Sequence, residues 1–229
     1  MEVFVGTSGW MYPWNKGKNL TWYVENSNLN AVELNASFYR FPFKNQIKGW
    51  ERRGKSLRWS IKVNRLITHR FKMNEEAKES FLKFLDLFKP MDEIIDFYLF
   101  QLPPSFGPDK EKRLLDFFEG FDKGKIVVEF RNKEWFKMDL EEWGRKNNLL
   151  VCSLDSPDFE KLIFNVNGKV YLRFHGRRNW YSYDYSMEEL KEIKDIILSK
   201  NPEKIYAFFN NNHSMLNNAQ TFLSLFNTY

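Results

Sequence analysis

The stretch Lys125-Ile126-Val127-Val128-Glu129-Phe130-Arg131 decides the fold of this chain. Three β-branched apolar residues run together in it, a pattern typical of a strand buried on both faces of a parallel sheet. Glu129 and Arg131 are two positions apart, so both side chains leave the strand on the same face. Parallel α/β folds place their functional residues at such strand ends. The stretch therefore predicts a buried strand that ends in a charged site.

The same signature, an apolar run that ends in polar residues, recurs along the whole chain. The further predicted strands are Val3–Val5, Ala31–Asn35, Leu57–Val63, Ile94–Gln101, Leu149–Asp155, Val170–Gly176 and Ile205–Phe209. Most connections are helical in pattern, such as the segment from Glu75 that Asn74 caps. We predict an α/β fold with one (β/α)8 TIM-barrel-like domain over residues 1–229. Residues 156–167 lack helical periodicity, which predicts a degenerate crossover between strands 6 and 7.

Composition favours a folded protein without a membrane segment. Hydrophobic residues make up 43% of the 229 residues and aromatic residues 18%, enough for a large core. The net charge of +5 permits an anionic ligand or nucleic acid without requiring either. One cysteine, Cys152, excludes a disulfide framework and fits a reducing compartment. The start of the chain lacks the features of a signal peptide, so we expect a cytoplasmic protein with no membrane partner. The oligomeric state stays open.

Several spaced motifs together resemble one known family. They are Gly6-Thr7-Ser8-Gly9-Trp10, Glu33-Leu34-Asn35, Thr68-His69, Gln101-Leu102-Pro103-Pro104-Ser105-Phe106, Val128-Glu129-Phe130-Arg131, Arg173-Phe174-His175-Gly176-Arg177 and Phe209-Asn210-Asn211. In this order, over nearly the whole chain, they resemble the DUF72 (YecE-like) family. The resemblance implies a TIM-barrel-like fold. It implies no activity and no catalytic residues, because the family is functionally uncharacterised.

Polar side chains at the predicted strand ends would converge on one mouth of such a barrel. We predict catalytic roles for Glu33, Glu129 and His175. The predicted ligand-binding residues are Ser8, Asn35, Tyr39, Lys62, His69, Gln101, Arg131, Asp155, Arg173, Arg177 and Asn210. We expect Arg131 to pair with Glu129, and Lys62 or Arg173 to pair with the other acids.

This set favours a metal-independent acid–base hydrolase or lyase that acts on a small polar, anionic or sugar-like ligand. Glu33 and Glu129 would serve as proton donor and base, as in glycoside hydrolysis. His175 beside Arg173 would be a base with a lowered pKa. A non-enzymatic alternative is a closed salt-bridge layer that plugs the barrel.

Two further alternatives involve a metal and nucleic acid. Glu33, Glu129, Asp155 and His175 are residue types that bind divalent metals, but the flanking cations oppose a dication, so we predict neither a metal site nor a cofactor. The basic residues Arg177 and Arg178 lie close in sequence to the aromatic residues Trp180 and Tyr181, a combination that nucleic-acid-binding proteins also use. A nucleic-acid-binding or processing protein, with metal-assisted phosphoester cleavage, is therefore the second hypothesis.

Overall fold

Eight parallel strands form a closed barrel in the computed structural model, which describes residues 1–226 except for the side chain of residue 160. The strand order is β5-β4-β3-β2-β1-β9-β8-β6, and pairing of β5 with β6 closes the ring. The strands are β1 (Glu2–Thr7), β2 (Ala31–Leu34), β3 (Arg58–Lys62), β4 (Ile95–Gln101), β5 (Ile126–Glu129), β6 (Leu150–Ser156), β8 (Lys169–Phe174) and β9 (Lys204–Phe209). This confirms the predicted TIM-barrel-like fold.

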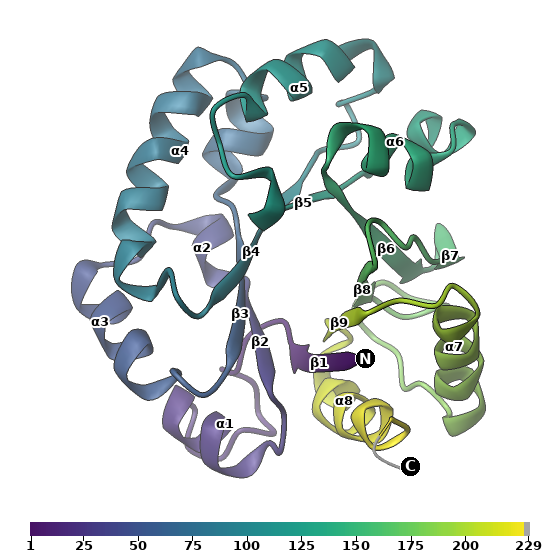
Figure 1. The fold of residues 1–229 in the computed structure, drawn as a ribbon. Coiled ribbons are helices and arrows are strands. Elements are labelled where there is room, and N and C mark those ends of the chain that lie inside the picture. The colour runs from purple at the N-terminus through teal and green to yellow at the C-terminus, as the bar shows by residue number, and fades with distance from the viewer. Residues whose placement is uncertain (227–229) are drawn as a thin grey trace.

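Helices surround the barrel on its outside (Figure 1). They are α1 (Leu20–Asn26), α2 (Ala36–Tyr39), α3 (Lys44–Arg53), α4 (Glu75–Phe88), α5 (Glu111–Phe118), α6 (Leu140–Asn147), α7 (Met187–Ser199) and α8 (Met215–Ser224). In α4 the Asn74 side chain accepts a hydrogen bond from the backbone N–H of Ala77, as its sequence predicts. No helix within residues 1–226 has the length and apolar character needed to cross a bilayer.

Some elements differ from the sequence prediction. The connection from β6 to β8 contains β7 (Phe159–Leu162), a short strand antiparallel to β6 that lies outside the barrel wall (Figure 1). The helices α1 and α2 and the π-helix Leu66–Arg70 lie in segments that the sequence did not predict as helical. All of these elements are short, between four and seven residues, and so carry little periodicity.

Aromatic rings fill the part of the barrel interior that lies on the amino-terminal side of the polar strand ends. Phe97 lies edge-on to Tyr171 and to Tyr206, with ring centroids 5.7 Å and 4.7 Å apart. This packing makes the barrel a filled core with no pore. The hydroxyl of Tyr171 points from this apolar layer to the polar residues at the strand ends. The buried charged residues Glu33, Glu129 and Arg173 lie above this layer, at the carboxyl ends of the strands.

Candidate functional site

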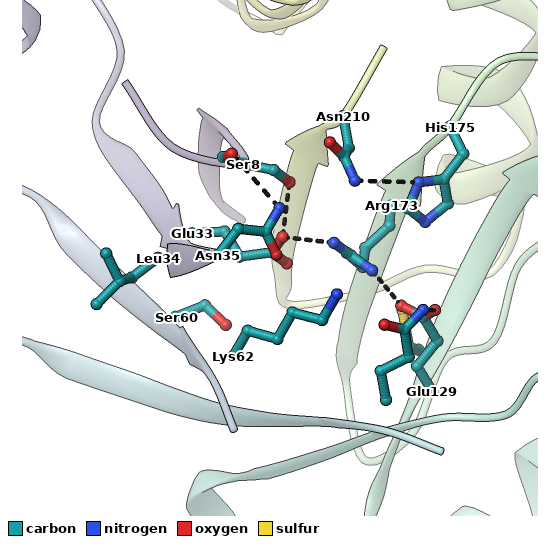
Figure 2. A network of polar contacts seen from close by, with 12 residues as sticks. Ser8, Glu33, Leu34, Asn35, Ser60, Lys62, Glu129, Arg173, His175 and Asn210 are labelled. Carbon is teal, nitrogen blue, oxygen red and sulfur yellow. Dashed lines mark hydrogen bonds and ion pairs between the residues drawn. The ribbon is translucent and has the colours of Figure 1, made fainter. Parts of the chain in front are cut away.

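Arg173 lies at the centre of the polar layer, between two carboxylates (Figure 2). Its Nη2 donates to Glu33 Oε1 at 2.7 Å, and its Nη1 donates to Glu129 Oε2 at 2.6 Å. These contacts join β8 to β2 and β5 across the barrel. All three side chains are fully buried. A buried ion-paired triad of this kind is costly to break from either side, because each partner would leave an unpaired charge.

Two hydroxyl groups donate to the Glu33 carboxylate, and a third supports one of them. Ser8 Oγ donates to Oε1 at 2.6 Å, and Tyr171 Oη donates to Oε2 at 2.8 Å. Because Tyr171 has one hydroxyl proton, Ser60 Oγ must donate to Tyr171 Oη, 2.7 Å away. Burial and the nearby Glu33 carboxylate raise the pKa of Tyr171 well above its usual value of 10.0. Glu33 is therefore fixed in position by neutral donors as well as by Arg173.

Glu129 is held by the groups around it in the same way. Arg131 Nε and Gln101 Nε2 donate to Oε1, the latter at 2.9 Å, in addition to the Arg173 contact. Burial alone would raise the pKa of Glu129, but Arg131 and Arg173 outweigh it and hold the pKa well below 4.5. Glu129 is thus an anion at neutral pH. The thiol of Cys152 lies 3.8 Å from Oε2, and burial and Glu129 raise its pKa, so it stays protonated.

His175 is a neutral, fully buried imidazole. Its Nε2 lies 3.1 Å from Arg131 Nη2, and a guanidinium can only donate, so Nε2 is the unprotonated nitrogen. Nδ1 then carries the proton. Asn210 Nδ2 lies 3.4 Å from Nδ1, so the Asn210 amide accepts this proton only when it is turned to bring Oδ1 to the ring. Burial, with Arg173 and Arg131, lowers the pKa of His175 well below 6.5.

Lys62 enters the same layer from the end of β3 with a different environment. It is 7% exposed, and Nζ has no hydrogen-bond or ion-pair partner within the described residues. Instead Nζ lies over the ring of Phe38, 4.2 Å from its centroid. Figure 2 shows the side chain extending toward Arg173 with no dashed contact. Burial and the Arg173 charge lower the pKa of Lys62 to about 7.

Asp155 and Arg177 form a separate cluster outside this layer. Strand register explains why Asp155 lies outside the layer. Leu154 pairs with Arg173, and Asp155 pairs with Phe174. The Phe174 ring packs outward against Phe209 of β9 and Phe222 of α8. The expected pairing of Asp155 with Lys62 or Arg173 is therefore wrong. Its carboxylate instead accepts from Arg177 Nε at 3.0 Å. Burial raises the pKa of Asp155 although Arg177 opposes this.

Tyr39 and His69 lie beside the layer without entering it. Phe38 separates them from Lys62, with its ring 5.1 Å from each of theirs. Thr68 Oγ1 is 2.8 Å from His69 Nδ1, and burial and the Lys62 charge lower the pKa of His69 to about 4. Tyr39 lines two hollows, one of about 510 Å³ that also contacts Ser8 and Asn35, and one of about 590 Å³ that contacts His69.

Tyr171 and Phe38 contribute to the layer but were not among the predicted site residues. Tyr171 could have been found from the sequence, because it precedes Arg173 by two residues and so shares its face. Phe38 had no such signal, because it lies on α2, which the sequence did not predict as a helix. Within residues 1–226, no group of three or more His, Cys, Asp or Glu side chains is arranged to hold a metal ion.

The fold and site together define a class, a TIM-barrel-like α/β protein whose barrel mouth holds a buried charged layer. The family model described as "Protein of unknown function DUF72" matches residues 4–229. The chain belongs to the DUF72 family.

Solved structures of the family share this fold over their full length. A DUF72 family protein from Enterococcus faecalis superimposes with a TM-score of 0.79 at 20% identity, covering 99% of this chain and 96% of that chain. A DUF72 family protein from Thermotoga maritima gives a TM-score of 0.78 at 24% identity, covering 99% and 100%.

A sugar epimerase has the same fold at greater distance. D-Psicose 3-epimerase from Clostridium cellulolyticum gives a TM-score of 0.56 at 13% identity, with 98% of each chain covered. At this identity the likeness concerns the fold alone. A comparison with curated proteins gives no match.

Proposed function

We propose that this chain is a metal-independent acid–base enzyme, a hydrolase or lyase, that binds a small anionic or sugar-like ligand at the charged layer. The observation that carries the proposal is an imbalance of buried charge. Lys62, Arg131 and Arg173 bring three basic groups against the two carboxylates of Glu33 and Glu129. Both guanidiniums have carboxylate partners and Lys62 has none among the described residues, so one cation is left for a ligand.

The contacts favour catalytic roles that differ from those predicted from the sequence for Glu33, Glu129 and His175. Glu33 and Glu129 are each held by several donors, and the Nε2 lone pair of His175 already accepts from Arg131. These three residues position the layer and orient Arg131 and Arg173. Lys62 is the acid or base, because its lowered pKa of about 7 makes both protonation states accessible near neutral pH.

Binding of inorganic sulfate tests the proposal, because sulfate keeps its charge across the pH range of interest. At pH 6 the Lys62 ammonium is expected to bind the anion, and a hydrogen bond to a charged group contributes about 1.5–3 kcal/mol. The Lys62→Met variant should therefore bind sulfate about tenfold more weakly or worse by calorimetry. Wild-type affinity should fall as the pH rises through 7, and the variant should show no such fall.

The matched control is Lys112→Met, since Lys112 is exposed on α5 and pairs with Asp116. This variant should bind sulfate as the wild type does. Equal loss in both lysine variants, or no change in either, would contradict a ligand site at Lys62.

A second candidate function, binding of single-stranded nucleic acid, is favoured by the hollow of about 590 Å³ beside α2. Arg40, Arg65 and Arg70 line it together with Tyr39, and no acidic residue does. The guanidinium of Arg65 lies over the Tyr39 ring, 5.9 Å from its centroid, and Tyr39 is 67% exposed. Exposed rings beside cations are a surface on which bases stack. Oligonucleotide binding that weakens steeply with salt and with Arg65→Ala, but not with Lys62→Met, would support this function.

A further inference from the structure

Lys62 differs from the other lysines of residues 1–226 in being buried within the fold. Its Nζ has no ion-pair or hydrogen-bond partner in this part of the chain, and it lies over the face of the Phe38 ring. A lysine kept only for charge balance would contact one of the carboxylates, yet Glu33 and Glu129 contact Arg173 and other donors instead. The surroundings thus leave the nitrogen lone pair available to a reacting atom.

The charges around Lys62 favour its neutral form. Arg173 and Arg131 disfavour a second cation, Glu129 and Glu33 favour it, and burial disfavours it most, so that the pKa falls to about 7. His69, on the other side of Phe38, is itself uncharged near neutral pH because its pKa is lowered to about 4. A desolvated amine beside another cationic group is the arrangement that activates lysine as a nucleophile toward carbonyl carbon.

We propose that Lys62 forms an imine with a small aldehyde or ketone, which makes it the covalent catalytic residue of this barrel. The inference rests on the proposed function and narrows it to a lyase acting on a carbonyl compound. The amine nitrogen bonds to the carbonyl carbon and gives a carbinolamine. A proton taken up on the hydroxyl group lets it leave as water, and a protonated imine remains. The imine then acts as an electron sink for cleavage of a neighbouring bond.

A hollow beside the charged layer indicates which carbonyl compound fits. Ser8 and Asn35 belong both to the edge of the charged layer and to the hollow of about 510 Å³ beside it. Asn35 Nδ2 donates to the Ser8 carbonyl oxygen, while its buried Oδ1 has no partner and can accept from a ligand hydroxyl. The remaining walls include the apolar side chains of Trp10, Leu34 and Trp50. The substrate class is therefore a hydroxylated aldehyde or ketone that lies in this hollow and extends its carbonyl past Ser8 and Asn35 to Lys62, which is not itself a lining residue.

Reductive trapping tests the inference on the full chain. The protein is incubated at pH 7 with glycolaldehyde and cyanoborohydride, which reduces an imine to a stable secondary amine. Peptide mass mapping then gives the labelling rate of each lysine. We expect Lys62 to be labelled at least tenfold faster than exposed Lys112, because an ordinary lysine with a pKa near 10.4 has a fraction of only about 0.0004 as free amine at pH 7.

One variant and a second readout separate the possible outcomes. Lys62→Arg keeps the positive charge but cannot form an imine, so it should lose the label and retain sulfate binding at pH 6. Labelling confined to exposed lysines, with Lys62 unmodified, overturns the imine. If the wild type still binds sulfate through Lys62 in that case, the proposed function stands without it. If sulfate binding is also absent, both fail.

Discussion

Replacing Arg173 by methionine is expected to lower the free energy of unfolding by about 3–5 kcal/mol, the usual cost of removing one partner from a buried ion pair. The change leaves the carboxylates of Glu33 and Glu129 buried and facing each other without the guanidinium that bridges them. Methionine is close in volume and flexible, so packing contributes little to the loss. Urea unfolding at pH 7 measures the effect.

The two carboxylates provide the internal control for this result. Adding Glu33→Gln and Glu129→Gln to Arg173→Met should recover part of the lost stability, because the unpaired charges are removed. A loss under about 1 kcal/mol in the single variant, the size typical of a surface pair, would mean that water or a rearrangement compensates the acids.

Glu129→Gln is expected to make the protein less stable at neutral pH and less sensitive to acid. Because the pKa of Glu129 is well below 4.5 in the folded protein, its carboxylate contributes stability that is present above pH 4.5. That contribution is lost as the pH falls below 4.5 through the folded-state pKa. At neutral pH the variant should lose about 1.5–3 kcal/mol, the contribution of a hydrogen bond to a charged group.

Unfolding curves of both proteins between pH 3 and 7 measure this difference. The gap between wild type and variant should be widest at neutral pH and should narrow as the pH falls. Glu142→Gln is the matched control, because Glu142 is exposed and pairs with Arg145 at the surface of α6. A gap that stays constant down to pH 3 would argue that Glu129 stabilises the fold by shape and not by charge.

The barrel itself could be predicted because its signals are repeated and local. Runs such as Ile126–Val128 identify buried strands, and the alternation with helices fixes the class. The strand β7 and the helix α1 were beyond reach, because β7 is formed by pairing with β6 and α1 has only seven residues. Pairing with a neighbouring strand leaves little trace in a four-residue sequence.

The site could be predicted in part because some of its signals are also local in the sequence. Two-residue spacing correctly placed Arg131 with Glu129, and Arg173 with His175, on shared faces. It failed for Asp155, because the face of a strand end depends on its register with the neighbouring strand, here Leu154 opposite Arg173. Sequence also gave no sign that Lys62 would lack a partner, since that depends on which carboxylates the two arginines occupy.

Titration of Lys62 shows whether the barrel mouth holds a buried amine that has no hydrogen-bond or ion-pair partner within residues 1–226. The 13Cε resonance of Lys62 in protein carrying labelled lysine, assigned with the Lys62→Arg variant, reports the protonation state at each pH. We predict a midpoint near pH 7, rising when sulfate is bound, because the anion stabilises the ammonium. A midpoint near pH 10.4, the ordinary value for lysine, would show that the amine is paired or hydrated and would contradict the account.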